Sequence, residues 1–495
     1  MKKYDVIAIG TGVGLAFIHN ALQKGLNCAI IEKGKFGGTC LTRGCIPSKI
    51  LVQPADLIRQ SKRAAKIGVN IPEISYNFDL IAKRMWHKIN LSIGMEEEFK
   101  NRDNLDVYKG VGEFIDNHTL RVLKEDSTYS ENIYGDLVVI ACGARSYVPN
   151  ISGLKETGYL TYETFYGDKF PKKPWKNLVI IGGGVIGVEF AHIFSSLGTK
   201  VTIIEMKNRL LINEDHEVSD FLLTQFNTNN IDVYLNCVAI EASKSKGKII
   251  KFKNHKTGII NEIECDEILM ASGIKPNLDL LKLENTGVEL CKYGWIKTNE
   301  FLETAVKSII AIGDVNGRFQ FRHKANYENF VAFDYRFNKD KPTRPANYDN
   351  VPWAVYTYPQ IAHLGLTEKQ ALDIHEKVLI GKLKYSDVAK GYALGYEEGD
   401  SDNGFVKLIL SPEMRILGAH IVGPYAAMLM QPYVYLKSTG MICKIDAFKD
   451  NINYETIKEN EYLFNPVNEA MVIHPSLNEL TGWAYRTLKW VTREN

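Results

Sequence analysis

The feature that most constrains the fold of this 495-residue chain is a pattern that occurs twice. Segments 4–14, YDVIAIGTGVG, and 177–190, NLVIIGGGVIGVEF, each join a short apolar strand to closely spaced glycines and a helical pattern. Each is followed by a second apolar strand that ends in an acid, Glu32 in CAIIEKG and Glu205 in VTIIEMK. A strand, a glycine turn, a helix and a second strand with a terminal acid form a dinucleotide-binding unit. The two copies predict an α/β protein with two such units.

The glycines of each copy have separate physical roles. Gly10 and Gly182 permit the tight turn. Gly12 and Gly184 let backbone amides approach a pyrophosphate at the helix N-terminus, where the helix dipole favours negative charge. Gly187 allows the second helix to pack closely on its strand. In both copies the acid about 20 residues further on accepts hydrogen bonds from a ribose.

The first copy departs from the usual glycine spacing. Leu15 stands where the third glycine is expected, and Gly14 precedes it. We therefore expect either that the first helix stands slightly further from its strand or that Gly14 makes the close contact instead.

A third segment bears on whether both units hold a nucleotide. Residues 304–317, TAVKSIIAIGDVNG, form an apolar strand that ends in Gly313 and Asp314. A carboxylate at such a strand end could hold a ribitol hydroxyl of a flavin, whereas a plain strand-terminating turn is the alternative. The segment favours two bound dinucleotides over one dinucleotide and a structural copy.

The pattern changes beyond residue 349. Segments 351–367, 404–410 and 415–423 alternate like antiparallel strands, and an apolar helix rich in Met and Tyr follows at 424–441. Pro432 should bend this helix or end its first part. A separate α+β domain with so apolar a helix is consistent with a subunit interface or with a buried core helix. The polar run 449–468 is interpreted as a surface insertion.

Charge and apolar runs exclude several classes of partner. A net charge of +2 gives no long-range field that would gather nucleic acid or an anionic membrane. No run reaches the ~18 to 20 apolar residues that span a bilayer. The apolar start is interrupted by Asp5 and lacks a small-residue cleavage site, which favours a buried first strand over a signal peptide.

The eight cysteines also bear on the compartment. Only Cys40 and Cys45 are close in sequence, and the rest are scattered: Cys28, Cys142, Cys237, Cys265, Cys291 and Cys443. This pattern is typical of a reducing compartment with one special pair, so we expect a cytoplasmic protein.

The close pair lies in GGTCLTRGC, residues 37–45, and could be two buried apolar side chains, half of a metal site or a reactive disulfide. No second Cys or His pair stands at zinc spacing, so no metal site is predicted. In a regular helix, residues five apart are ~7.5 Å apart along the axis, whereas a disulfide needs Cα atoms roughly 4.4 to 6.8 Å apart. We expect Gly44 and Pro47 to distort the segment. The reactive disulfide is favoured, because such a small ring is comparatively reducible.

The longer segment GGTCLTRGCIPSK, residues 37–49, resembles the redox-disulfide segment of the class I pyridine nucleotide–disulfide oxidoreductases. This family includes dihydrolipoamide dehydrogenase, glutathione reductase, mycothione reductase and mercuric reductase. The resemblance covers nearly the whole chain, because the motifs occur in the family's order and at its distances. It implies a homodimer whose subunits share active sites, built from two Rossmann-like domains and a C-terminal α+β dimerisation domain. The implied ranges are 1–150 and 281–348 for the FAD-binding domain, 151–280 for the NAD(P)-binding domain and 349–495 for the dimerisation domain.

The resemblance also implies residue roles. Cys40 would be the interchange thiol that attacks the substrate disulfide, and Cys45 would lie under the flavin as the charge-transfer thiolate. Lys49 would lie near the reactive end of the isoalloxazine ring and pair with Glu189. Asp314 would bind the ribitol of FAD. The residues implied to contact the cofactors are Gly10, Gly12, Gly14, Glu32, Lys33, Gly38, Thr39, Lys49, Gly143, Gly182, Gly184, Gly187, Glu189, Glu205, Gly273, Gly313 and Asp314.

The segment MVIHPSLNEL, residues 471–480, matches the family's terminal His-Pro-x-x-x-Glu element. His474 would be the acid–base of the partner subunit's active site, oriented by Glu479. The chemistry needs such a pair, because a thiol must lose its proton before it attacks, and imidazole accepts protons near neutral pH. A carboxylate on the other ring nitrogen fixes the tautomer and stabilises the imidazolium.

Several positions depart from typical dihydrolipoamide dehydrogenases. Thr42 and Arg43 replace Asn and Val between the cysteines, Cys142 replaces a Thr, Ile274 replaces an Arg and Met428 replaces a Glu. The first glycine turn, the segment GPYAAMLMQP at 423–432 and the IHPSLNE ending are closer to mycothione reductases. A Lys-, Asn- and Ile-rich composition weighs against a mycothiol producer.

Glu205 decides the expected nucleotide, because its carboxylate would bind a ribose 2′-hydroxyl and repel a 2′-phosphate. NAD(H) is therefore predicted, with NADPH as the alternative that Lys207 and Arg209 keep open. The leading functional prediction is an FAD enzyme that moves electrons between NAD(H) and a small-molecule or protein-bound dithiol, dihydrolipoamide first. The alternatives are an NAD(P)H-dependent reductase of a low-molecular-weight disulfide, of the mycothione or glutathione reductase type, and a non-enzymatic flavin-binding redox sensor.

Overall fold

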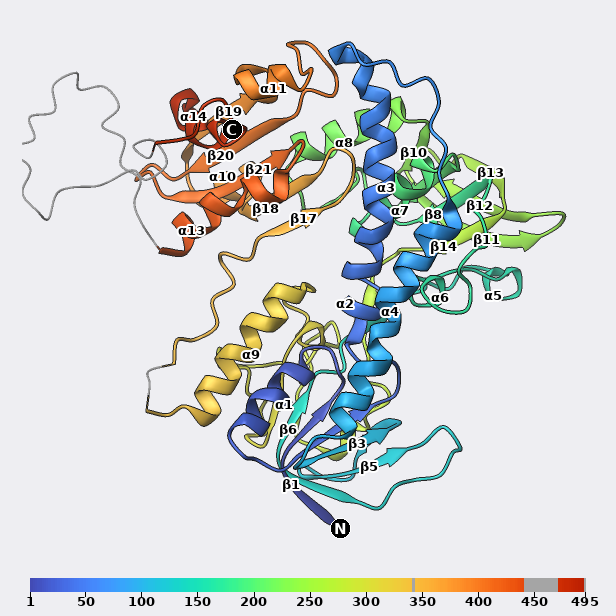
Figure 1. Cartoon of the computed structure of the whole chain (residues 1–495), viewed down its shortest axis with the longest axis vertical. Coiled ribbons are helices and arrows are strands. Elements are labelled where there is room, and N and C mark those ends of the chain that lie inside the picture. Colours follow the sequence, from blue (N-terminus) through green and yellow to red (C-terminus); the bar gives the residue numbers. More distant parts are fainter. Residues whose placement is uncertain (341–342, 440–470, 494–495) are drawn as a thin grey trace, which may run out of the picture.

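The structure is a computed structural model that describes residues 1–340, 343–439 and 471–493. The predicted insertion at 449–468 and Cys443 lie outside these residues. Figure 1 shows three lobes: the N-terminal strand lies in the lower one, the second glycine turn in the one on the right, and the last sheet in the upper left one.

The first sheet has seven strands in the order β3-β2-β1-β6-β5-β4, with β16 paired to β6. Its strands are β1 (Lys2–Ile9), β2 (Cys28–Glu32), β3 (Leu105–Lys109), β4 (Val111–Phe114), β5 (Thr119–Leu123), β6 (Ile133–Ile140) and β16 (Ile309–Ala311). Neighbouring strands among β1, β2, β3, β6 and β16 pair in parallel. Parallel strands are usually covered on both faces of the sheet, which is consistent with the burial of every residue in the run Val6–Ile9. Helix α1 (Gly14–Gln23) packs against α9 (Arg322–Phe337), where the rings of Phe17 and Phe333 lie 5.2 Å apart. A segment beyond the second glycine turn thus completes the first sheet.

The second nucleotide unit is a parallel sheet in the order β10-β9-β8-β14 beside an antiparallel sheet β11-β12-β13. Its strands are β8 (Asn177–Ile181), β9 (Lys200–Glu205), β10 (Ile231–Leu235), β11 (Cys237–Lys244), β12 (Lys248–Asn254), β13 (Ile260–Cys265) and β14 (Glu267–Met270). Its helices are α5 (Leu154–Thr157), α6 (Tyr162–Phe165), α7 (Val185–Ser196) and α8 (His216–Thr228). A two-stranded ribbon of β7 (Ala144–Ser146) and β15 (Ile274–Pro276) joins the segments that enter and leave this unit. The exact domain boundaries stay predictions.

Helices α2 (Gly38–Thr42), α3 (Cys45–Arg63) and α4 (Phe78–Lys100) run between the lobes in Figure 1. Helix α3 packs against α7 through Arg59, whose guanidinium donates to the hydroxyls of Ser195 and Ser196 and to the Asn229 side chain. Arg59 is buried, so these bonds replace the water that the charge loses. The C-terminal part of α3 is thereby held against the second nucleotide unit.

The third sheet is antiparallel, in the order β17-β18-β21-β20-β19-β22. Its strands are β17 (Trp353–Val355), β18 (Ile361–Gly365), β19 (Lys377–Lys384), β20 (Phe405–Leu410), β21 (Ile416–Val422) and β22 (Lys489–Thr492). Its helices are α10 (Glu368–Ile374), α11 (Ala389–Ala393), α12 (Ala426–Leu429), α13 (Gln431–Thr439) and α14 (Glu479–Trp483). The predicted strands of this region are present, and the sequence missed β19 and β22. The apolar helix is interrupted at Met430, two residues before Pro432, as a proline requires.

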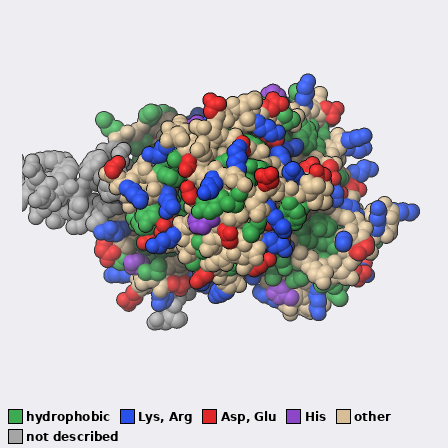
Figure 2. Space-filling view, turned by 90° about the horizontal axis from the view of Figure 1, so that it is seen from below, with side chains coloured by type: hydrophobic (Ala, Val, Ile, Leu, Met, Phe, Trp, Pro, Cys, Tyr) green, Lys and Arg blue, Asp and Glu red, His purple; other side chains and the backbone are tan. Residues whose placement is uncertain are grey.

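Figure 2 shows basic and acidic side chains interspersed over one face of the molecule, in keeping with the net charge of +2. Among the described residues, no helix is long and apolar enough to cross a membrane.

Candidate functional site: two sulfurs at the end of a nucleotide cavity

The first glycine turn brings backbone segments into very close contact. Gly10 has φ +100°, and a Cβ there would lie 2.5 Å from the Ala141 carbonyl oxygen. A Cβ on Gly38, which has φ +64°, would lie 2.5 Å from the Cα of Gly12. Helix α1 meets its strand β1 through Gly14, where a Cβ would lie 3.5 Å from that of Ala8. Gly14 therefore makes the close contact between helix and strand, which is the second of the two arrangements expected from Leu15 at the third glycine position.

This turn forms one wall of a cavity, which gathers most of the residues implied to bind FAD. Its lining includes Gly10, Gly12, Glu32, Lys33, Gly38, Thr39, Cys40, Cys45, Gly143, Gly313 and Asp314. Gly14 and Lys49 are not part of the lining. Cys142 is part of it, with its Sγ 3.7 Å from the Asn277 carbonyl oxygen.

The two acids of this cavity differ in their surroundings. Glu32 holds the turn itself, because it accepts hydrogen bonds from the amide and hydroxyl of Thr11, at 2.9 and 2.6 Å, and from the Gly34 amide. Burial raises the pKa of Asp314 to about 6. In the described part of the chain, no protein group donates a hydrogen bond to its carboxyl. A hydroxyl-bearing ligand would supply that donor, so glycine walls and an unpartnered carboxyl fit FAD.

We expect Gly38→Ala to bind FAD at least ~10-fold more weakly, since a loss of 1.4 kcal/mol is tenfold in affinity. The new Cβ would be strained at φ +64° and would push the turn at Gly12 out of place. Flavin content after purification and titration of the apoprotein with FAD measure the effect. Gly94→Ala is the matched control, because a Cβ at this position of α4 meets nothing within 4 Å. Equal affinities in both variants would contradict the assignment of the turn.

The helix is interrupted between the two cysteines, so they are not held at the spacing of a regular helix. Helix α2 ends at Thr42 and α3 begins at Cys45, so the two cysteines lie on separate helices. Gly44 adopts φ −139° and ψ −113° at the break. Pro47 lies in the first turn of α3, where a proline is tolerated, so the distortion is at Gly44 and not at Pro47. Both cysteines are free in the structure.

The thiols of the pair have opposite pKa shifts. A hydrogen bond between them, aided by the charge of Lys49 and opposed by burial, lowers the pKa of Cys45 to about 7. The same hydrogen bond, together with burial, raises the pKa of Cys40 above its ordinary value. Arg322 and Lys49 act against that rise. Cys45 is therefore the thiolate and Cys40 the protonated partner, which needs a base before it can attack.

Lys49 links this pair to the second nucleotide unit. Its Nζ lies 2.9 and 2.7 Å from the two carboxylate oxygens of Glu189 on α7. The Tyr356 amide also donates to Glu189, and Nζ lies 4.5 Å from the centre of the Tyr356 ring. Glu189 is buried, and the contacts with Lys49 and the Tyr356 amide compensate the burial of its charge.

In the two-electron-reduced holoenzyme, the thiolate of Cys45 should titrate with an apparent pKa near the lowered value of about 7. The pKa is depressed, so the thiolate predominates above this pH and is lost as the pH falls through it. The long-wavelength absorbance that a thiolate produces beside a flavin should follow the same curve. Lys49→Met should move the midpoint to higher pH. Lys62→Met, an exposed site at the far end of α3, should not, and an unchanged midpoint in Lys49→Met would contradict the assignment.

The second glycine turn repeats the acid-to-turn bond of the first. Glu205 accepts hydrogen bonds from the amides of Gly183 and Lys207, at 2.5 and 2.6 Å. A Cβ on Gly187 would lie 2.0 Å from the Gly182 carbonyl oxygen, so helix and strand touch there. The predicted residues of this unit, Gly182, Gly184, Gly187, Glu205 and Gly273, lie outside the cavity that contains the cysteines.

His474 and Glu479 form a pair outside the cavity. The Nδ1 of His474 lies 2.7 Å from the Glu479 carboxylate, which also accepts a hydrogen bond from the Ser476 amide. Burial alone would raise the pKa of Glu479, but these hydrogen bonds lower it below its ordinary value. The imidazole is 67% exposed, with Nε2 as its remaining nitrogen. Within one chain, therefore, the pair is not brought to the sulfurs.

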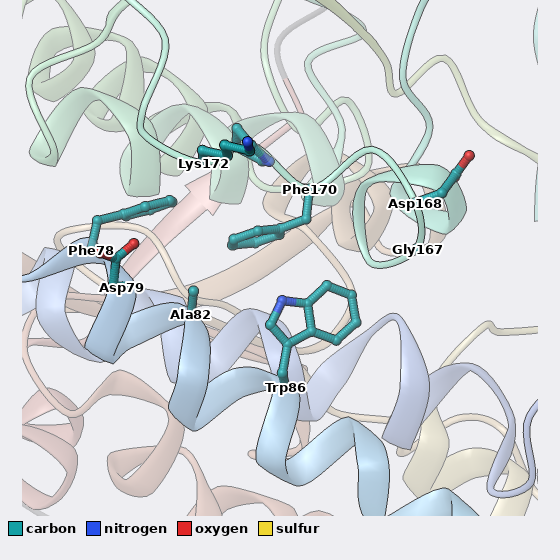
Figure 3. A pocket seen from close by; sticks show the side chains of 9 residues that line it. Phe78, Asp79, Ala82, Trp86, Gly167, Asp168, Phe170 and Lys172 are labelled. Atoms are coloured by element: carbon teal, nitrogen blue, oxygen red, sulfur yellow. The ribbon is translucent and has the colours of Figure 1, made fainter.

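Sequence reasoning missed several residues that line the cavity, including Thr11, Asn277 and Arg322. Arg322 begins α9 and lies near enough to Cys40 to affect its pKa. Its position in the chain carries no motif, so only the packing of α9 against the cavity reveals it. A second hollow, shown in Figure 3, lies between α4 and residues 167–172 and is lined by Phe78, Trp86 and Phe170. It contains none of the predicted site residues.

Comparison with known protein families shows to which family the chain belongs. Residues 4–328 match the pyridine nucleotide-disulphide oxidoreductase family, and residues 351–462 match the dimerisation domain of that family. The chain belongs to the pyridine nucleotide-disulphide oxidoreductases. The predicted family and fold class are thereby confirmed, with an FAD/NAD-binding part followed by a dimerisation domain.

Relatives of this oxidoreductase extend over the whole chain. A dihydrolipoyl dehydrogenase of Bacillus subtilis (strain 168) is 31% identical over 480 residues, which cover 94% of this chain and 97% of the relative. One of Mycobacterium tuberculosis (strain ATCC 25618 / H37Rv) is 31% identical over 435 residues, or 87% and 90% of the two chains. The Cu(II) complex of the HOCl-induced flavoprotein disulfide reductase RclA from Escherichia coli superimposes with a TM-score of 0.81 at 25% identity, over 98% and 99% of the two chains.

Proposed function

We propose that this flavoprotein moves an electron pair between NAD(H) and a dithiol or disulfide through Cys40 and Cys45, with dihydrolipoamide as the substrate. The observation that carries the proposal is the hydrogen-bonded thiol pair at the end of the glycine-walled cavity, with Cys45 as the thiolate. The ion pair of Lys49 and Glu189 joins this end to the helix of the second nucleotide unit. The choice of dihydrolipoamide is supported by the relatives named dihydrolipoyl dehydrogenase.

FAD, when bound, supplies the two-electron carrier between the nicotinamide and the sulfurs. The first glycine turn, Glu32, Gly38 and Asp314 would hold it. In the reducing direction, Cys40 loses its proton to His474 of the partner subunit and attacks one sulfur of the substrate disulfide. The leaving sulfur takes that proton back from the imidazolium. The thiolate of Cys45 then attacks the sulfur of Cys40, which closes the Cys40–Cys45 disulfide and releases the second substrate sulfur as a thiolate that takes its proton from water. Two thiols are oxidised and one disulfide is reduced; dihydrolipoamide oxidation is the reverse.

The decisive assay uses the purified holoenzyme with lipoamide, glutathione disulfide and mycothiol disulfide, first with NADH and then with NADPH. Turnover of lipoamide alone supports the proposed substrate. Turnover of glutathione or mycothiol disulfide without lipoamide would replace it with the low-molecular-weight disulfide reductase. No turnover of any disulfide would favour the redox sensor.

The second candidate, a low-molecular-weight disulfide reductase, is favoured by the charges around Cys40. Arg43 and Arg322 both line the cavity, and the charge of Arg322 opposes the rise in the pKa of Cys40. The buried Nε of Arg43 has no protein partner in the described part of the chain. A carboxylate-bearing disulfide would meet these cations, whereas lipoamide carries no negative charge.

The enzyme should prefer NADH over NADPH by at least ~10² in kcat/KM, because a carboxylate at the end of β9 repels a 2′-phosphate. Glu205→Ser should lower the ratio of kcat/KM for NADH to that for NADPH. Lys207→Ala tests whether the ammonium group of Lys207 binds the 2′-phosphate of NADPH. Steady-state kinetics with both nucleotides measure the ratio. Equal efficiency of the wild type with NADPH would refute the preference.

The dimerisation domain indicates a homodimer. We infer that each subunit supplies its His474 to the other, since this side chain is exposed and lies outside the cavity of its own chain. The scattered cysteines of the sequence support the proposed cytoplasmic location.

A further inference from the structure

A buried cluster of three side chains lies where the second nucleotide unit meets the third sheet. His363 on β18 and His420 on β21 are direct cross-strand partners, so both side chains project from the same face of the sheet. Glu214 approaches this face from the turn before α8. Glu214 and His420 are fully buried, and His363 is 5% exposed. One ligating atom from each of the three lies within 4.8 Å of the others.

The hydrogen-bond partners define which ring nitrogens are occupied. The Nε2 of His363 lies 2.8 Å from the Gly365 carbonyl oxygen, and that of His420 lies 3.1 Å from the Leu366 carbonyl oxygen. A carbonyl oxygen only accepts, so each Nε2 carries a hydrogen. The two Nδ1 atoms face the two carboxylate oxygens of Glu214, at 3.0 and 2.8 Å. A carboxylate also only accepts, so these contacts need either a proton on each ring or one cation between the three groups.

The charged groups in and around the cluster carry a net charge of −2, which two positive charges at the histidines would balance. Lys407 is fully buried and contacts Asp215, Glu217 and Glu368, and Lys382 also contacts Glu217. These three carboxylates and that of Glu214 carry four negative charges, and the two ammonium groups carry two positive charges, which leaves a net charge of −2. Protonating both rings would supply two positive charges, but the ring centres are only 4.7 Å apart in a buried site, where like charges repel. A single divalent ion supplies the same charge and leaves both rings neutral.

We propose that Glu214, His363 and His420 bind a divalent transition metal, with Zn²⁺ as its natural occupant. Two imidazoles and a glutamate form a known zinc-binding set, which leaves the fourth tetrahedral position to water. Imidazole ligands select this class of metal over Mg²⁺ and Ca²⁺. The two carbonyls that hold Nε2–H act as the outer partners that orient metal-bound histidines. The ion fastens the second nucleotide unit to the dimerisation domain, away from the sulfurs.

The test measures metal content of oxidised holoenzyme in a Cys40→Ser background, so that the reactive thiol pair cannot bind the metal. After incubation with Zn²⁺ and gel filtration, about one Zn²⁺ per chain should remain bound to the three side chains. His363→Gln and His420→Gln should each lose it. His192→Gln should keep it, because this buried histidine faces a single carboxylate, that of Asp56. No bound zinc, or equal zinc in all variants, overturns the proposal.

A second measurement covers variants that fail to fold. In the holoenzyme that carries Cys40→Ser as its only substitution, Zn²⁺ should raise the unfolding midpoint by ~4 °C or more, because an ion that binds only the native state stabilises it. Co²⁺ should give the visible absorption of a tetrahedral complex, beyond the flavin bands. His363→Cys, which keeps a ligand but not the imidazole hydrogen bonds, should restore zinc binding. A midpoint that does not respond to Zn²⁺, together with the absence of a Co²⁺ spectrum, overturns the proposal.

Discussion

A Cys45→Ser enzyme loses disulfide reduction by at least ~10³-fold, as expected when one member of a catalytic unit is removed. The reason is that Cys40 alone can form a mixed disulfide with the substrate but has no second thiol to release it. The variant should also lack the long-wavelength absorbance after anaerobic two-electron reduction, since Cys45 is the thiolate of the pair. Stopped-flow and anaerobic titration measure the two effects.

The controls separate the roles of the three cysteines that line the cavity. Cys40→Ser should lose turnover as Cys45→Ser does, but should retain the thiolate absorbance, because Cys45 remains. Cys142→Ser lies in the same cavity and should keep both, since its thiol has no sulfur partner among the described residues and burial raises its pKa to about 12. Long-wavelength absorbance that survives in Cys45→Ser and is lost in Cys40→Ser would exchange the assigned roles.

Replacing His474 with alanine should slow thiol–disulfide exchange by ~10² or more, the usual contribution of a general acid–base. Cys40 has a raised pKa, so its attack depends on an external base, and the Nε2 of this imidazole is the nitrogen that Glu479 leaves available. Reduction of the flavin by NADH should survive. Rapid-reaction kinetics resolve the two half-reactions, and equal losses in both would count against the role.

A mixed dimer tests which subunit uses the histidine. Refolding Cys45→Ser together with His474→Ala, each inactive alone, should restore about a quarter of the wild-type activity if sites are shared, because half of the dimers then contain one intact site of two. Glu479→Gln serves as the graded control, since it keeps the imidazole but weakens its orientation. Mixtures that stay inactive although heterodimers form would show that the histidine does not serve the partner.

Much of this fold could be predicted, because its signals are local. The strand, glycine turn, helix and acid of each unit occupy about 30 consecutive residues, and the periodicity-2 segments after residue 349 became β17, β18, β20 and β21. The strands β19 and β22 went unpredicted; β22 pairs with β19 across more than a hundred residues, whereas β19 also pairs with the predicted strand β20. The reactive pair was also local, and the helix break at Gly44 is a backbone property of that short segment.

The sequence by itself determined the two nucleotide units, the reactive cysteines and the family, since each rests on neighbouring residues whose types and spacing are dictated by backbone geometry and sulfur chemistry. Tertiary structure alone decided which distant side chains meet. Arg322 reaches Cys40 only because α9 packs beside the cavity. Glu214 stands 149 and 206 positions from His363 and His420, and only the packing of α8 on the third sheet brings the three together, because burial forces their polar atoms to find partners in one another.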